Sequence, residues 1–210
     1  SDSSLDFSDC SDVRMYKAIL DRCGCHTATF ERALLNHASL KSAVLNRIEA
    51  TDVDMGNADL EQAGLIEANL MDCSLNGANL ENVEMSNAYL VRSNMGFANL
   101  KNIVMIKADV SRSVLALTQA HKMNAVLADF SDCDLQDAEF FRSNMSYMSC
   151  QRSHMVGTDF MEADLTGADC RGADCTDAIF EKANLRDIDL RMATLTRTGL
   201  KSQNTVATSC

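Results

Sequence analysis

Large apolar residues recur at every fifth position of the chain, from Leu5 to Cys210. Residues 56–100 show the pattern without a gap: GNADL EQAGL IEANL MDCSL NGANL ENVEM SNAYL VRSNM GFANL. Of the 42 positions at multiples of five, 19 are Leu, 7 Met, 6 Cys and 5 Phe. The residue two places earlier is Ala at 20 of 42 positions, and the residue between them is Asp or Asn at 19 of 42. Each block of five therefore holds one large and one small apolar position.

A period of five fits neither regular element of secondary structure. An α-helix advances about 100° per residue and would spread the large residues around its whole surface. A straight strand would send successive large residues to opposite faces, because five is odd. The chain must therefore turn once in every block, so that all large residues point to a common axis, as in a solenoid. The absence of Pro from all 210 residues agrees with this, since Pro would delete a donor of the backbone ladder.

The blocks resemble the A(D/N)LXX motif of the pentapeptide-repeat family, and the resemblance extends over essentially the whole chain. It implies an all-β fold, a right-handed quadrilateral β-helix with one block per side and about ten coils. The residue at each multiple of five and the small residue two places before it would point inward. We expect residues 1–210 to form a single domain of this kind.

Residues about 20 apart would then stack in successive coils. One inward ladder of centre residues would contain Leu60, Leu80, Leu100, Phe140, Phe160 and Phe180. The repeat is weakest at residues 113–127, where two successive centres are Ala120 and Ala125 and the small position holds Met123. We expect either a bulge, with Leu117, Met123 or Leu127 filling the core, or a loop that leaves the rod.

Two outward features suggest a contact surface. The first is a group of apolar residues that would lie on one face of the rod: Val104, Ile106, Val126, Leu127 and Tyr147. The group is either a candidate protein contact or a local irregularity that buries these side chains itself. The second is a stripe of carboxylates at multiples of 20, namely Asp109, Asp129, Asp169 and Asp189. The stripe indicates either a solvated face that reflects the preference of the motif for Asp, or charge mimicry of a DNA duplex.

The overall charge narrows the choice of partner. A net charge of -11 and a pI of about 4.7 argue against direct binding of nucleic acid, which needs clusters of Lys and Arg. No apolar run is long enough to span a bilayer. We expect a protein partner and a cytoplasmic location, with secretion or an organelle lumen as alternatives. Terminal coils expose strand edges, so the sequence leaves two alternatives open: a homodimer through an uncapped end of the rod, or a domain excised from a longer chain.

The sequence predicts no catalytic residue, metal site or cofactor. All nine Cys fall on inward positions, no C-x-x-C pair occurs, and all four His fall on outward positions. Cys150 and Cys170 would lie one coil apart, so a disulfide between them stays open. We favour reduced thiols, because a ladder of buried apolar residues needs no covalent bond.

Three functions are compatible with this pattern. The first is a non-enzymatic scaffold or protein-interaction module. The second is an acidic DNA mimic that binds a type II topoisomerase, DNA gyrase, which the resemblance implies through the quinolone-resistance members of the family. The third is the repeat domain of a secreted bacterial effector.

Overall fold

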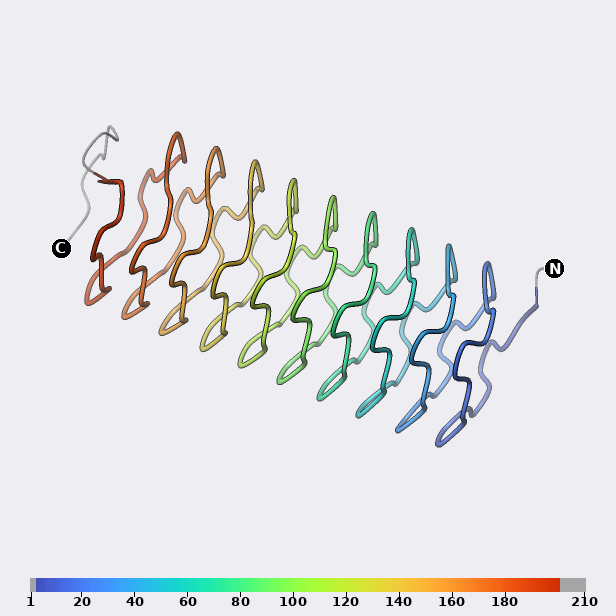
Figure 1. The fold of residues 1–210 in the computed structure, drawn as a ribbon. Helices are drawn as coiled ribbons and strands as arrows, with labels where there is room; N and C mark the ends of the chain where they lie inside the picture. Colours follow the sequence, from blue (N-terminus) through green and yellow to red (C-terminus); the bar gives the residue numbers. More distant parts are fainter. Residues whose placement is uncertain (1–2, 201–210) are drawn as a thin grey trace.

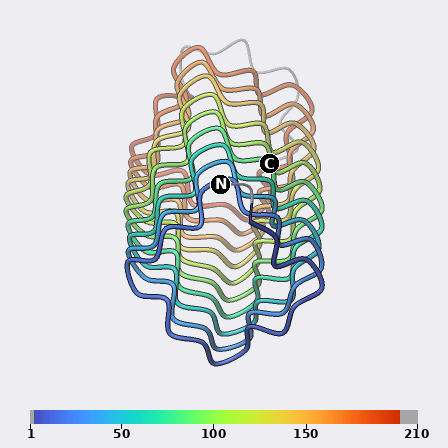
Figure 2. The same ribbon diagram turned by 90° about the vertical axis from the view of Figure 1, so that its right-hand side faces the viewer.

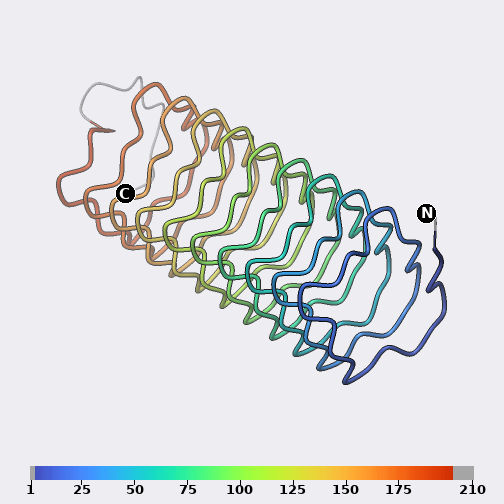
Figure 3. The same ribbon diagram turned by 45° about the vertical axis from the view of Figure 1, so that its right-hand side comes forward.

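The computed structural model describes residues 3–200, which form a rod of stacked coils whose first and last described coils lie at opposite ends of the rod (Figure 1). Viewed from the other directions, the coils follow one another around a shared interior (Figures 2 and 3). Parallel bridges join each residue to the residue 20 places on, from Ser4 with Gly24 to Asp174 with Thr194. Every coil therefore contains four blocks of five, and the predicted four-sided β-helix is confirmed.

Single bridge residues replace longer strands in this fold. Within residues 3–200 there is no α-helix, and so no helix that could cross a membrane. The Cα atoms of Cys150 and Cys170, one coil apart, are separated by 4.8 Å. This is the ordinary spacing of neighbouring strands.

Each block of five consists of a corner and a side. Counting each multiple of five as position 5, positions 1 and 2 form the corner, and positions 3, 4 and 5 form the side. Position 4 carries the bridge and points outward, while positions 3 and 5 point inward. In the second coil, side 1 is residues 23–25, side 2 is 28–30, side 3 is 33–35 and side 4 is 38–40. Corner 1/2 is residues 26–27, corner 2/3 is residues 31–32 and corner 3/4 is residues 36–37. Adding or subtracting multiples of 20 gives the same places in the other coils.

The corners are tight turns. At most of them the N–H of position 3 donates to the C=O of the preceding position 5, as from Ala63 to Leu60 at 2.9 Å. Position 2 has a positive φ in every block from Phe7 to Arg197. A positive φ at the third residue, with no positive φ at the second, is typical of a type II turn. Val and Ile never occur at position 2, where a branched Cβ would be most strained, and Thr27 is the one β-branched residue there.

Positions 3 and 5 fill the interior. Between Cys23 and Leu190 every residue at these two positions is buried. The side 4 ladder of centre residues is at most 2% exposed at Leu60, Leu80, Leu100, Phe140, Phe160 and Phe180. The rings of Phe140 and Phe160 stack with centroids 5.4 Å apart, and Phe160 and Phe180 stack at the same distance. Phe130 on side 2 meets Phe140 edge-on at 6.5 Å, so centre residues of opposite sides touch across the core.

Buried hydroxyls at position 3 are satisfied by the backbone. The Ser153 hydroxyl donates to the C=O of Phe130 at 2.6 Å and accepts from the N–H of Cys133 at 3.3 Å. Ser93 and Ser113 make the same type of bond to Leu70 and Leu90, both at 2.7 Å. Small polar residues can therefore replace Ala at this position at little cost, because no buried polar group loses its partner.

Residues 113–127 keep the regular coil, so the structure has neither the bulge nor the loop that the sequence allows there. Bridges pair Val114 with Asp134, Gln119 with Glu139 and Asn124 with Asn144. Met123 is 1% exposed, whereas Leu117 is 48% and Leu127 is 51% exposed. Met123 alone among the three candidates supplies apolar volume beside Ala120 and Ala125.

Three blocks exchange their large and small positions. Each has a large residue at position 3 and a small one at position 5, and all six are buried: Ile48 with Ala50, Met123 with Ala125, and Met148 with Cys150. In these three blocks the large residue at position 3 makes up for the small centre residue. Thr205 and Cys210, the last two centres of the sequence, lie outside the described residues.

Candidate functional site

The outward apolar residues that the sequence singles out lie together on corner 1/2 and the edge of side 1. We call them the corner ridge: Val104, Ile106, Val126, Leu127 and Tyr147. They occupy three consecutive coils, and the side chains of Leu127 and Tyr147 are 51% and 59% exposed. The corner ridge is therefore a surface feature and does not bury itself.

Tyr147, the last residue of the corner ridge, covers Gly167 of the next coil. A Cβ atom placed on Gly167 would lie 2.6 Å from two ring carbons of Tyr147. Gly167 also has a φ of +65°, which L side chains rarely adopt. The Tyr147 ring thus lies along the rod over the next coil, where a side chain at position 167 would displace it.

The carboxylate stripe occupies position 4 of side 2, and its placement follows from the turns. Oδ1 of Asp129 accepts the N–H of Ser131 at 2.8 Å, and Oδ1 of Asp109 accepts that of Ser111 at 3.0 Å. The same bond to the residue two places on is made by every Asp and Asn at position 4 of residues 3–200 except Asn124. Asp and Asn are favoured there because they hold the chain into the next corner.

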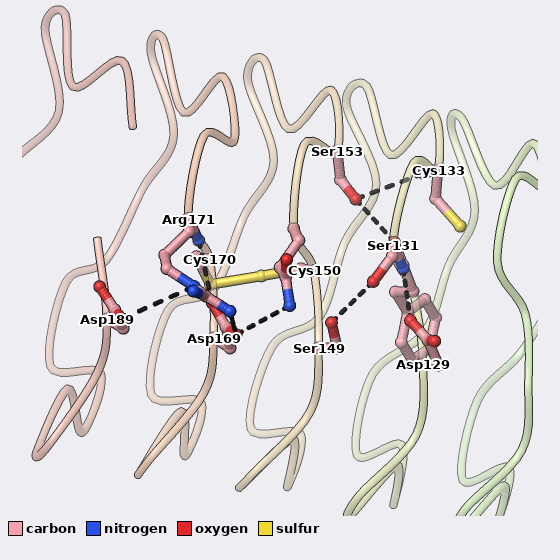
Figure 4. The surroundings of a disulfide bond; sticks show 12 residues. Asp129, Ser131, Cys133, Ser149, Cys150, Ser153, Asp169, Cys170, Arg171 and Asp189 are labelled. Carbon is pink, nitrogen blue, oxygen red and sulfur yellow. Dashed lines mark hydrogen bonds and ion pairs between the residues drawn. A yellow bond between two sulfur atoms is a disulfide. The ribbon is translucent and has the colours of Figure 1, made fainter. Parts of the chain in front are cut away.

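Arginines compensate the charge of the C-terminal half of the stripe. Arg171 lies 2.7 Å from the Asp169 carboxylate and 3.7 Å from that of Asp189 (Figure 4). Arg191 lies 2.6 Å from the Asp189 carboxylate. Hydrogen bonds from these guanidinium groups hold the pKa of both carboxyls below the usual range.

The carboxylates in the N-terminal half of the stripe differ from these two in their ion pairing. Among residues 3–200, Asp109 and Asp129 form no ion pair with Lys, Arg or His. They lie on side 2 in the same coils as Ile106 and Leu127 of the corner ridge. Within the described residues, the four carboxylates thus divide into a pair bound to arginines and a pair beside the ridge that forms no ion pair.

Cys150 and Cys170 lie at the centre of side 2, on the inner face of the stripe. The sequence favours reduced thiols, whereas the structure joins the two sulfur atoms in a disulfide (Figure 4). Their Cα separation of 4.8 Å lies within the range for such a bond, because the parallel stack puts the residues one coil apart. Both are at most 2% exposed, so the bond is enclosed by the rod.

The remaining thiols are poorly suited to chemistry. Burial raises the pKa of Cys73, Cys133 and Cys175 to about 12, and it also raises the pKa of Cys25. A protonated thiol is a weak nucleophile and a weak metal ligand. Among residues 3–200 no group of three or more His, Cys, Asp or Glu is placed to hold a metal ion.

Comparisons with known proteins agree with this architecture. The family described as Pentapeptide repeats matches in 8 copies, over residues 28–65, 68–105 and 158–197. No curated protein matches the chain. Residues 106–157 therefore lie outside the family match although they continue the same coil.

Two solved structures show the same fold. HetL, a pentapeptide repeat protein involved in heterocyst differentiation regulation from the cyanobacterium Nostoc sp. strain PCC 7120, is 24% identical with a TM-score of 0.71, over 95% of this chain and 87% of HetL. Trypsin-treated QnrB1, a plasmid-mediated fluoroquinolone resistance protein, is 12% identical with a TM-score of 0.54, over 92% of this chain and 89% of that chain. At these identities the likeness shows the fold alone, and the predicted right-handed β-helix is confirmed.

Proposed function

Because the chain belongs to the pentapeptide-repeat family, we propose that it is a non-enzymatic scaffold that binds a protein partner through the corner ridge. The observation that carries this proposal is the position of exposed Leu127 and Tyr147 beside the carboxylates of Asp109 and Asp129, for which the described residues provide no ion pair. Aliphatic and aromatic side chains with a polar margin are typical of the centre of a protein interface.

The filled interior supports a role that does not depend on catalysis. Side chains at positions 3 and 5 occupy the core from Cys23 to Leu190. The thiols with a raised pKa lie inside it, away from any substrate. Hollows of about 330 and 450 Å³ lie at the two ends of the described rod, and one of about 250 Å³ lies on corner 2/3 beside Gly172. None of these hollows lies on the corner ridge.

The variants Leu127→Asp and Tyr147→Asp test the proposal. Both residues occupy position 2, where Asp132 and Asp137 already have the required positive φ, so the rod should fold normally. With the rod as bait, a protein that wild type retains should bind either variant at least about 30-fold more weakly, because a central contact contributes 2 kcal/mol or more.

The matched control is Asn87→Asp, which adds the same charge at position 2 of the same corner, one coil before the ridge begins. It should leave the affinity of the retained protein unchanged. Equal retention by wild type and both ridge variants would place the binding surface elsewhere on the rod.

Binding to a type II topoisomerase is the alternative with fold-level support, from the likeness to QnrB1 and the net charge of -11. The pairing of Arg171 with Asp169 and Arg191 with Asp189 weakens it, since a DNA mimic needs uncompensated charge along the stripe. A gyrase supercoiling assay with titrated protein tests it. If the protein neither inhibits nor protects gyrase at any concentration, this alternative is excluded. The corner ridge would serve equally in the repeat domain of a secreted effector.

A further inference from the structure

A second surface, diagonally opposite the corner ridge, carries no charge over three consecutive coils. All Asp, Glu, Lys and Arg of residues 3–200 occupy outward positions, so a gap in their distribution is easily seen. The gap is centred on corner 3/4 and includes position 4 of sides 3 and 4. We call it the neutral strip: Ser74, Asn76, Gly77, Asn79, Asn94, Gly96, Phe97, Asn99, Val114, Ala116, Leu117 and Gln119.

Apolar side chains project from the neutral strip. Phe97 is 65% exposed, Leu117 is 48% and Val114 is 40%. Phe97 and Leu117 stand at position 2 of adjacent coils. Beside Phe97, a Cβ atom on Gly96 would lie 3.2 Å from Nδ2 of Asn76 and 3.3 Å from Oδ1 of Asn94. The surface next to the Phe97 ring is therefore low and closely packed, which leaves the ring open to a partner.

Three of the five amides of the strip, those of Asn79, Asn94 and Asn99, bond to the rod itself. Nδ2 of Asn99 donates to Oδ1 of Asn79, and Nδ2 of Asn79 donates to Oδ1 of Asp59, both at 3.0 Å. Oδ1 of Asn94 accepts the N–H of Gly96 at 3.0 Å. Groups that already have partners lose little when water is removed, so a protein can cover the strip at a low desolvation cost.

Carboxylates flank the strip at both ends. Position 4 of side 3 reads Asp54, Ser74, Asn94, Val114 and Asp134 along successive bridges. Among residues 3–200 neither Asp54 nor Asp134 forms an ion pair, and the same is true of Asp137, on the corner next to Asp134. Four coils separate Asp54 from Asp134, which at strand spacing is about 19 Å.

We propose that the neutral strip binds a protein segment with apolar residues at its centre and Lys or Arg at both ends, about 19 Å apart. A helix of about 13 residues or a strand of about six covers that distance. The carboxylates disfavour a second copy of this chain, because a parallel contact would place Asp54 against Asp54 and an antiparallel contact would place it against Asp134. The strip and the corner ridge are centred on diagonally opposite corners of the rod, so a partner at the centre of one surface leaves the centre of the other open.

Peptide selection tests this proposal without knowledge of the natural partner. A displayed library of random 20-residue peptides is selected on the wild-type rod and depleted on the Phe97→Asp variant. Asp is a frequent residue at position 2, so this variant should keep the thermal midpoint of wild type. The surviving peptides should share an apolar centre with Lys or Arg at both ends.

A synthetic peptide of the consensus sequence then provides the quantitative test. Phe97→Asp should weaken its binding at least about 30-fold. Asp54→Asn and Asp134→Asn should each weaken it about two- to fivefold and reduce its dependence on salt. Asn94 makes the turn bond that Asp54 and Asp134 make, so these two variants remove the charge and keep the turn.

Leu127→Asp on the corner ridge is the matched control and should leave the affinity of the peptide unchanged, so the two surfaces are tested separately. A consensus without basic ends would overturn the proposal, as would the absence of any peptide that depends on Phe97. Sedimentation that shows a wild-type dimer abolished by Phe97→Asp would also overturn it, in favour of a second copy.

Discussion

Two neighbouring regions of the rod differ in sequence and share one structure. Residues 68–105 match the family motif, whereas residues 106–157 do not. Yet bridges 20 residues apart continue from Glu84 with Val104 to Asn124 with Asn144. Position 2 also keeps its positive φ throughout both regions. The backbone ladder and the turns therefore determine the coil, and the centre side chains need only fill it.

The second region keeps its core volume by redistribution. Met123 compensates for Ala125 within one block, and Met148 compensates for Cys150 in another. Large and small centres are also combined within a coil, since Ala125 shares its coil with Phe130 and Phe140. A motif that scores each position separately misses this exchange, because the volume is kept by pairs of residues.

A charge in the core should have the largest effect, and it should be equally severe in both regions. Leu80→Asp in the first region and Leu115→Asp in the second each place an unpaired carboxylate at a fully buried centre. Each should lower the free energy of unfolding by at least about 4 kcal/mol or prevent folding. Denaturant titration measures this, with Glu81→Ala on the outer surface as a control that should change stability by less than about 0.5 kcal/mol. If Leu115→Asp were tolerated, the second region would not share the core of the first.

An exchange of volume should have the next largest effect. Met123→Ala should cost about 2–5 kcal/mol through the cavity it leaves, and Ala125→Leu about 1–3 kcal/mol through overpacking. The double variant restores the ordinary motif and should recover most of the loss, which a double-mutant cycle would measure. Additive losses would mean that the two side chains do not share one space.

The sequence predicts the coil, its period and its inward positions, because a strict period of five admits few other structures. It does not settle residues 113–127, because small residues at successive centres such as Ala120 and Ala125 are compatible with both a regular coil and a loop. The role of Asp109 and Asp129 in the turns also needs the backbone, since hydrogen bonding at a corner depends on φ. The neutral strip, by contrast, is visible once residues 20 apart are aligned.

Loss of the disulfide, which joins the second region to the matched residues 158–197 that follow it, should have an effect of similar size. The bond closes a loop of 20 residues. Replacing Cys150 and Cys170 together by Ala should lower the free energy of unfolding by about 3 kcal/mol, mainly through the entropy of the unfolded chain. Cys175→Ala, at the next centre along the chain, is the unbonded control.

Thiol titration after denaturation tests the bond directly. Of the nine Cys, the titration should find two fewer thiols without reductant than with it. Equal counts, together with equal unfolding midpoints, would show that the thiols are reduced, as the sequence favours.

A β-branched residue in a corner should have the smallest effect, and again the same one in both regions, the first taken here together with the matched residues 28–65 that precede it. Gln62→Val and Lys122→Val place a branched Cβ at φ values of 60° and 57° on the same corner of different coils. Each should cost about 1–2 kcal/mol in thermal or chemical unfolding. Met71→Val at position 1, where Val91 and Val126 already occur, should be nearly neutral. A clear difference between Gln62→Val and Lys122→Val would mean that the corners of the two regions are not equivalent.

The bridge from each residue to the one 20 places on makes residue number a cylindrical coordinate. Its remainder after division by 20 gives the direction in which a side chain points, and its quotient gives the height along the axis. Removing one whole coil would lower everything beyond it by about 4.8 Å without rotation. Removing a single block of five would turn everything beyond it by a quarter of a revolution. Evolution can thus lengthen or shorten this rod freely only in steps of 20 residues if surfaces made by several coils, such as the neutral strip, are to stay aligned.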